Sequence, residues 1–290
     1  MALLEQDEDL GTLFAALRVR YGDSLRAVLL YGSYTRGERD TLIDLYVLTE
    51  GPVPTAALPH WQRFANRILA PNVYQLGVAT GARCKYALVP LAAFERHLRE
   101  DFHSYFWARF AQPCQVLYVA DAGTATRLVV CLANAVRRML TEAQRGMPHC
   151  APTPQALWQH ALSQTYRCEL RAESGLRAGQ LVERDHAYFV QLAQAWSAEQ
   201  PRVEGNRSSW PLAASPGGWR WPARRLWGKA LSVARLLKAA FTFNDGFEYL
   251  LWKIERHSGI YVEPTPLQRR WPLLFAWPLF WRLYRLGAFR

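Results

Sequence analysis

The chain has 290 residues, half of them hydrophobic, and a formal net charge of +11. This composition excludes a disordered protein, and the length is enough for a full core shared between about two domains. The five cysteines show no C-x-x-C spacing and the acidic N-terminus is not a secretory signal, which predicts reduced thiols in a cytoplasmic protein.

The first 121 residues alternate predicted helices with predicted strands. Amphipathic spacing predicts a helix from Leu10 to Arg20, and apolar residues predict a strand from Ala27 to Tyr31. A hairpin leads to a second strand around Asp44, followed by a helix at 60–69 and strands at 72–79, 83–91 and 114–121. We therefore expect an α+β fold whose sheet domain occupies residues 1–121.

The second half is predicted to be helical. Apolar residues recur at helical spacing from Thr124 onward, and a further helix is predicted at 152–173, so residues 122–200 are expected to form a helical domain that completes the site. A stretch rich in Pro, Gly and Ser predicts a linker at 201–222. Residues 223–290 are predicted to be helical and basic.

The hairpin carries the first candidate for chemistry. Gly32 would let phosphate approach the backbone closely, and the Ser33 hydroxyl and Arg36 guanidinium would contact phosphate oxygens. Asp44 on the facing strand is suited to bind Mg²⁺. A Gly-Ser turn facing an Asp-x-Asp strand is typical of polymerase-beta-like nucleotidyltransferases, although Leu42 occupies the first acidic position here. The same residues also fit an ordinary hairpin in which Asp44 caps a turn.

The order of several short segments extends this pattern along the chain. The segments are YGS, LIDLYVLT, CKYALVP, WARFAQPCQVLYV and TYRCELRAE, within residues 28–172. In order and spacing they resemble the mitochondrial-type CDP-diacylglycerol synthases, the translocator assembly and maintenance family. That family also lacks the first carboxylate. The resemblance implies a polymerase-beta-like core that uses Mg²⁺ to make CDP-diacylglycerol and pyrophosphate from CTP and phosphatidic acid.

Matching the motifs position by position implies roles for individual residues. Asp44, Lys85 and Glu169 would be catalytic, and Asp44 with Glu169 would hold the metal ion. The residues implied to bind the nucleotide are Tyr31, Gly32, Ser33, Arg36, Arg109, Tyr166 and Arg171. Each also has a simpler interpretation, because Lys85 on a strand is often a solvated edge residue, while surface arginines commonly form ion pairs and a helical Glu is commonly exposed.

Two positions depart from the family pattern. Tyr34 replaces the second glycine of the turn, and Ala87 replaces the glycine that follows the Lys-Tyr pair. A bulky side chain at position 34 is expected to leave less room for the nucleotide.

The C-terminal part is both basic and aromatic. From Arg220 to Arg290 there are 13 Lys and Arg against 4 Asp and Glu, and eight of the twelve Trp lie between Trp210 and Trp281. No apolar run reaches the roughly 18–20 residues that span a bilayer. Trp favours the headgroup region and Arg favours anionic lipid, so a peripheral membrane contact is expected. The predicted contact residues are Arg269, Arg270, Trp271, Trp277, Trp281, Arg282 and Arg285.

The alternative for this segment is a helix packed on the protein's own core, and nucleic acid is not the expected partner. We expect the protein on the cytoplasmic face of the inner membrane. Two other functions stay open at this point. One is a nucleotidyltransferase that acts on a soluble small molecule or a protein, and the other is a non-catalytic nucleotide-binding relative.

Overall fold

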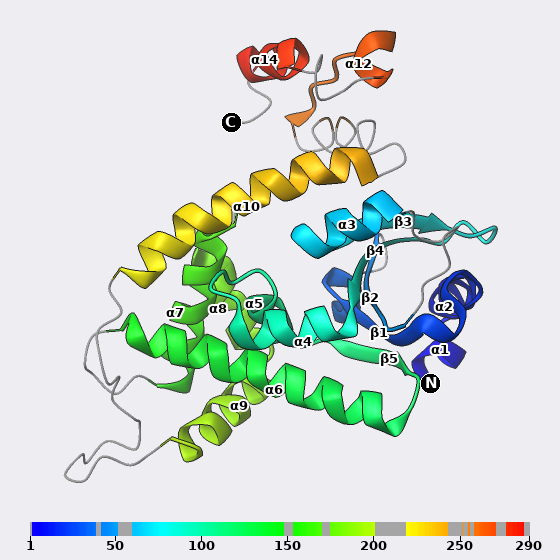
Figure 1. The fold of residues 1–290 in the computed structure, drawn as a ribbon. Coiled ribbons are helices and arrows are strands. Elements are labelled where there is room, and N and C mark those ends of the chain that lie inside the picture. The colour runs from blue at the N-terminus through cyan, green and yellow to red at the C-terminus, as the bar shows by residue number, and fades with distance from the viewer. Residues whose placement is uncertain are drawn as a thin grey trace.

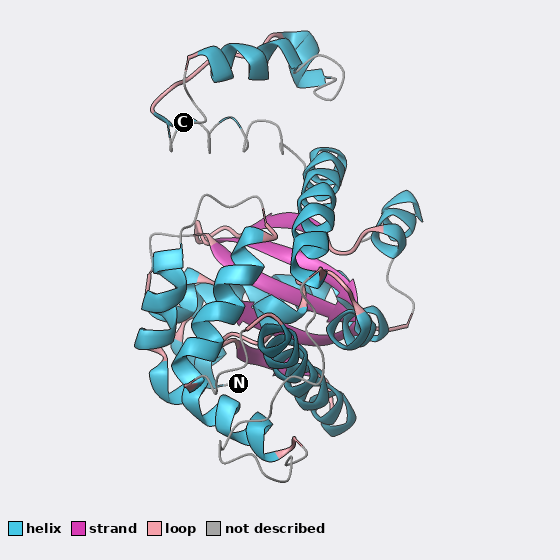
Figure 2. Ribbon diagram, turned by 90° about the vertical axis from the view of Figure 1, so that its left-hand side faces the viewer, coloured by secondary structure: helices cyan, strands magenta, loops and turns pink. Residues whose placement is uncertain are grey.

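A five-stranded sheet forms the centre of the fold, and helices lie on both of its faces (Figures 1 and 2). The computed structural model describes residues 2–38, 42–51, 60–147, 153–169, 175–200, 219–242, 251, 255, 258–270 and 277–286. The strands are β1 (Leu25–Tyr31), β2 (Ile43–Thr49), β3 (Asn72–Gly77), β4 (Arg83–Pro90) and β5 (Gln115–Val119). Their order is β3-β4-β2-β1-β5, and only the β2–β4 pair is parallel. The predicted α+β fold is confirmed.

Helices supply the rest of the described structure. They are α1 (Ala2–Gln6), α2 (Glu8–Tyr21), α3 (His60–Ile68), α4 (Leu91–Glu100), α5 (Trp107–Phe110), α6 (Ala122–Arg145), α7 (Pro154–Arg167), α8 (Gly175–Arg184), α9 (His186–Ala198), α10 (Arg220–Thr242), α12 (Pro266–Arg270) and α14 (Trp277–Arg285), with 3-10 turns η1 (Gly22–Ser24) and η2 (Ser33–Arg36). Side-chain caps begin several of them. The Asp121 carboxylate, for example, accepts a 2.7 Å hydrogen bond from the Thr124 amide at the start of α6.

The two faces of the sheet are buried by different helices. Alternate residues of β2 divide between them: Leu45 and Val47 pack with α2, while Tyr46 and Leu48 pack with α4, α5 and α6. Because strand side chains alternate between faces, an apolar strand such as β2 can bury both sides at once. The larger cluster continues from the sheet through α6, α7, α8 and α9 as far as Trp221.

Some predicted element boundaries differ from the structure. Helix α7 ends at Arg167 with Cys168 as its C-cap, so Glu169 lies in the turn after the helix and not on it. Arg171 lies outside the described residues. Helix α10 begins at Arg220, three residues before the C-terminal region predicted from position 223, because Pro222 is tolerated in a first helical turn.

Helix α10 is anchored to three parts of the molecule. Arg224 is fully buried and donates to the buried Glu142 carboxylate on α6 at 2.7 Å. Gly228 faces the residue that caps α7, and a Cβ at this position would lie 2.5 Å from the Cys168 carbonyl oxygen. Lys238 donates to carbonyl oxygens just ahead of β3. Helix α10 therefore ties the helical layer to the β3 edge of the sheet.

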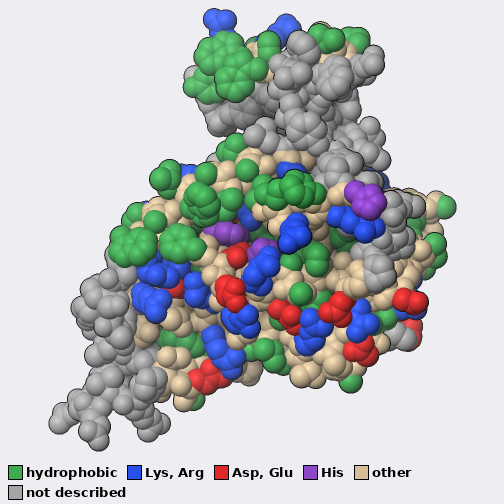
Figure 3. All heavy atoms as spheres, viewed as in Figure 1, with side chains coloured by type: hydrophobic (Ala, Val, Ile, Leu, Met, Phe, Trp, Pro, Cys, Tyr) green, Lys and Arg blue, Asp and Glu red, His purple; other side chains and the backbone are tan. Residues whose placement is uncertain are grey.

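Helix α14 exposes several of the predicted membrane residues. Trp277 and Trp281 are 76% and 56% exposed, while Leu279 and Leu283 on the same helix are buried. Figure 3 shows large hydrophobic side chains beside basic ones on this part of the molecule. Arg282 and Arg285 are also exposed. Arg269 and Arg270 lie in α12, and Trp271 falls outside the described residues. Within the described part of the chain, no helix is both long and apolar enough to cross a membrane.

Candidate active site

The turn after β1 brings a glycine into direct contact with the predicted metal ligand. Gly32 has a φ of +86°, a conformation that residues with a side chain rarely adopt. A Cβ added at this position would lie 2.9 Å from Oδ2 of Asp44. The sequence places glycine here for two reasons, since the backbone requires a positive φ and the Asp44 carboxylate occupies the space of a side chain.

Tyr34 does not crowd this turn. The 3-10 conformation of η2 directs its ring away from the cavity, and the ring is buried in the cluster between α2 and the sheet. Its hydroxyl donates to Oδ2 of Asp7 at 2.7 Å. Thr35 braces the turn on the other side by donating to the Gly32 carbonyl oxygen at 2.7 Å. The expectation that Tyr34 reduces room for a ligand was wrong, because sequence spacing does not reveal the direction of a side chain in a 3-10 turn.

Three predicted site residues lie in one row across the sheet. Tyr31 on β1 is opposite Asp44 on β2, and Asp44 is opposite Lys85 on β4. Cross-strand neighbours point to the same face, so all three side chains project toward the α4 and α5 side. The described residues offer the Asp44 carboxylate no hydrogen bond and no ion pair within 4 Å. This carboxylate is therefore available to an external ligand.

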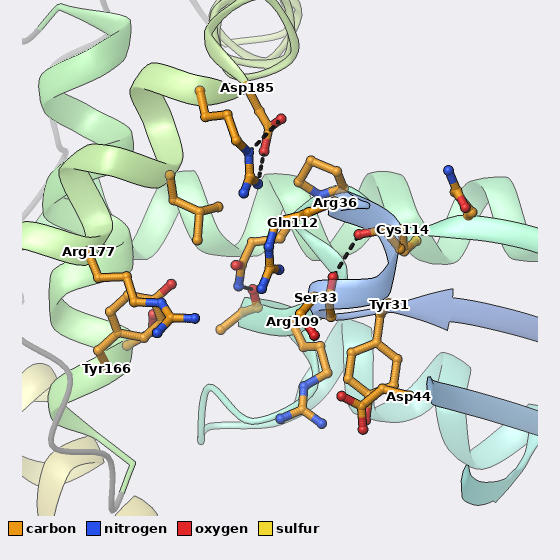
Figure 4. A pocket seen from close by; sticks show the side chains of 18 of the residues that line it. Tyr31, Ser33, Arg36, Asp44, Arg109, Gln112, Cys114, Tyr166, Arg177 and Asp185 are labelled. Atoms are coloured by element: carbon orange, nitrogen blue, oxygen red, sulfur yellow. Dashed lines mark hydrogen bonds and ion pairs between the residues drawn. The ribbon is translucent and has the colours of Figure 1, made fainter. Parts of the chain in front are cut away.

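A cavity of about 340 Å³ opens beside this row, between β1, η2, α5, α7 and α8 (Figure 4). It is within the size range of small-molecule sites. Of the predicted site residues, it is lined by Tyr31, Gly32, Ser33, Arg36, Asp44, Arg109, Tyr166 and Glu169. These come from segments more than 130 positions apart in the sequence. Lys85 is not among the lining residues.

Arg109 is the central cation of the site. Its guanidinium lies over the rings of Tyr31 and Tyr105, at 5.0 and 4.8 Å from their centroids, and donates to the Tyr46 hydroxyl at 3.2 Å. Burial by itself would lower the pKa of Arg109, but the neighbouring tyrosine hydroxyls and Glu169 together hold it well above its ordinary value. Arg109 therefore stays charged while its stacked aromatic neighbours fix its direction.

The rest of the cavity wall is also rich in cations. Arg177 and Arg184 of α8 join Arg36 and Arg109, although Arg184 pairs with the adjacent Asp185 at 2.6 Å. Four guanidinium groups line a cavity that holds three carboxylates. Such a lining suits an anionic ligand with several oxygen atoms, because guanidinium groups match phosphate geometry.

Sequence reasoning missed several of these residues. Arg177 and Arg184 belong to a short amphipathic helix whose pattern does not distinguish a site residue from a solvated one, and Asp185 lies between that helix and α9. Arg235 of α10 was also missed, although its guanidinium carbon lies 3.9 Å from the centroid of the Tyr105 ring. No local motif marks a residue that reaches the site from 130 positions downstream.

The site fits a magnesium ion that arrives together with a phosphorylated ligand. Asp44 and Glu169 both line the cavity, and no group of three or more His, Cys, Asp or Glu suited to a metal occurs among the described residues. Magnesium keeps several waters and is often held by one or two carboxylates plus substrate phosphates, so two acids are enough. The Asp44 carboxylate, which is pressed against Gly32 and has no partner in the part of the chain that the structure describes, is the better candidate ligand of the two.

These observations define an α+β protein with a basic cavity built around a glycine turn and the Asp44 carboxylate, for which the described residues provide no partner. The sequence matches no family model and no curated protein. Among solved structures, the chain is similar to a nucleotidyltransferase-like protein from Exiguobacterium sibiricum 255-15, with 12% sequence identity and a TM-score of 0.30. That alignment covers 97% of this chain and 92% of the other.

Proposed function

We propose that the protein is a nucleotidyltransferase, and specifically a phosphatidate cytidylyltransferase that works at a membrane surface. One observation carries the proposal: Asp44, which has no hydrogen-bond or ion-pair partner among the described residues, lies against the Gly32 turn inside a cavity lined with arginines. This is what a magnesium-bound triphosphate requires. The choice of CTP and phosphatidic acid rests on the order of motifs in the sequence, which resembles the CDP-diacylglycerol synthases.

In this reaction an oxygen of the phosphatidate phosphate attacks the α-phosphorus of CTP. The bond from the α-phosphorus to the oxygen bridging to the β-phosphorus breaks, and pyrophosphate leaves with the electron pair. A phosphate monoester is already anionic at neutral pH, so no strong general base is needed. Catalysis consists of positioning and charge neutralisation.

The side chains of this site divide that work. Gly32 and Ser33 would receive the phosphates at the turn, while Arg36 and Arg109 would neutralise their oxygens. Magnesium, held by Asp44 with Glu169 as the second carboxylate, would supply further neutralisation of the triphosphate when bound.

A lipid acceptor requires contact with a membrane, and α14 offers it. Trp277 and Trp281 are exposed beside Arg282 and Arg285, which combines the side chains that favour the headgroup region with those that favour anionic lipid. The double change of Trp277 and Trp281 to Ser is expected to reduce co-sedimentation with anionic vesicles. Trp219→Ser removes an equally exposed Trp outside α14 and serves as the control. An equal loss in both variants would contradict this role for α14.

The catalytic proposal is tested with the purified full-length protein, Mg²⁺ and phosphatidate vesicles, using each of the four nucleoside triphosphates in turn. We expect CDP-diacylglycerol and pyrophosphate with CTP. Asp44→Asn should abolish turnover at an unchanged melting temperature. Asp23→Asn should keep turnover, because Asp23 is exposed in η1 and so lies at the end of β1 opposite to the cavity-lining Tyr31. Nucleotide transfer to a soluble acceptor but not to phosphatidate would refute the lipid as the acceptor. Failure to bind any nucleotide would refute the proposal that the protein is a nucleotidyltransferase.

A further inference from the structure

A second cluster of cations lies on the side of Asp44 that faces away from the cavity. Its centre is Tyr105, in the segment between α4 and α5. The guanidinium of Arg235 lies 3.9 Å from the Tyr105 ring centroid and that of Arg109 lies 4.8 Å from it. Lys85 on β4 adjoins Asp44 in the sheet, and its charge also acts on Tyr105. Burial would raise the pKa of Tyr105, but these three cations outweigh it and lower the pKa.

The order of the strands separates this cluster from the cavity. Asp44 is on β2, the cavity lies toward β1 and α8, and Lys85 lies on β4 on the other side. Helix α10, which carries Arg235, packs against β3 at the same edge. Arg109 and Asp44 line the cavity and also adjoin this cluster. A ligand at Tyr105 would therefore meet a ligand in the cavity at Asp44.

Among the described residues, no carboxylate pairs directly with the cations of this cluster, although the charge of Glu169 acts on Arg109. None of its three cations has a carboxylate within 4 Å in the part of the chain that the structure describes. Asp101, whose charge also acts on Arg235, is held by His97 and His103 at 2.9 and 3.0 Å. Burial and the charge of Arg109 both lower the pKa of Arg235. Two guanidinium groups at one ring, with the charge of Lys85 acting on the same ring, cost free energy that a bound anion would recover.

An anchoring role explains Arg235 only in part. Its Nε donates to the Ala70 carbonyl oxygen at 3.1 Å, which fixes α10 to the segment before β3. A neutral donor could make that one hydrogen bond. That hydrogen bond does not account for the positive charge of the guanidinium or for its position over Tyr105. Both of these properties suit binding of a phosphate group.

We propose that Lys85, Arg109 and Arg235 form a binding site for a phosphate monoester, and that this is where the acceptor of the proposed transfer places its phosphate. The assignment of this site to the acceptor rests on the proposed function, whereas the existence of an anion-binding site does not. The site explains why a lysine adjoins Asp44. A hydroxyl acceptor needs a base at such a place, but an acceptor that is already anionic needs a cation. Arg235 is then a specificity-determining residue.

The test measures binding of short-chain dihexanoyl phosphatidate to the full chain by calorimetry, without nucleotide. Arg235→Gln should weaken binding about tenfold or more, because a charge-assisted hydrogen bond is lost. Lys229→Gln, which removes an exposed charge from α10, should leave the affinity unchanged. Arg235→Lys should recover part of it. Inorganic phosphate and dihexanoylglycerol are the comparison ligands and show whether the phosphate alone, or the lipid without it, is bound.

The outcomes separate this site from the proposed reaction. No binding by the wild-type protein, or an equal loss in Arg235→Gln and Lys229→Gln, would overturn the site. If binding depends on Arg235 but the protein transfers no nucleotide, the anion-binding site is supported and the nucleotidyltransferase function is refuted. In turnover assays Arg235→Gln should raise the KM for phosphatidate and leave the KM for CTP unchanged, which a merely structural change would not do. If Arg235→Gln does not fold, Lys85→Gln provides the same comparison.

Discussion

The contact between Gly32 and Asp44 leads to a sharp prediction for Gly32→Ala. The substitution has two costs. Alanine at a φ of +86° and a ψ of −156° lies in a region that is essentially restricted to glycine and is strained by about 1–3 kcal/mol, and its Cβ would lie 2.9 Å from Oδ2 of Asp44. Ordinary contact begins near 3.4 Å, so the carboxylate must shift by about half an ångström. Misplacing a catalytic group by about 1 Å costs on the order of 100-fold in rate, and half that shift about tenfold.

Gly37 provides a control in the same turn, in the left-handed α conformation that alanine adopts at lower cost. Its φ is +84°, but a Cβ there would meet nothing within 4 Å. Gly37→Ala should therefore lose about 1 kcal/mol of stability and keep its activity, while Gly32→Ala loses at least as much stability and about tenfold in kcat/KM. Urea unfolding measures the first quantity, and pyrophosphate release from CTP measures the second. Equal kcat/KM in the two variants would refute the view that the turn positions Asp44.

Further predictions concern stability. Glu142→Gln should cost about 3 kcal/mol or more in urea unfolding, because it leaves buried Arg224 without its carboxylate partner. Burial would raise the pKa of Glu142, but its arginine partners lower it from 4.5 to about 2. The unfolded chain therefore takes up this proton first, and stability should fall between about pH 4.5 and pH 2, more steeply in the wild type than in Glu142→Gln. An identical slope in the two proteins would contradict this. Tyr34→Phe should lose about 1 kcal/mol with its hydrogen bond to Asp7 and keep turnover, since Tyr34 lies outside the cavity. Loss of turnover without loss of stability would place Tyr34 in the site instead.

The sheet was predictable because each strand has a local signal. Strands β3, β4 and β5 fall inside the predicted ranges, since β-branched and aromatic residues between turn residues favour a strand wherever the chain later packs. The turn at Gly32 and the acid at Asp44 were predictable as a pair for a similar reason, because both belong to one hairpin of short sequence separation.

The rest of the site depends on tertiary structure. The direction of Tyr34 follows from a 3-10 turn that no residue pattern marks, and the position of Glu169 follows from the end of α7. Arg235 reaches Tyr105 only because α10 is fixed at the β3 edge. Such placements are products of packing between distant segments, and a single sequence does not contain a signal for them.

The close approach of α10 to Cys168 has a consequence for natural variation in this chain. Any side chain at position 228 would overlap the Cys168 carbonyl oxygen, so either the helix or the turn would have to move. Glu169 is the next residue along that turn. A harmful substitution is thus expected at a position that touches neither substrate nor metal, and a screen for inactive variants would find it among apparent surface residues of a helix. Glycine would be retained at position 228 because Cys168, 60 positions earlier in the sequence, leaves no space for a side chain.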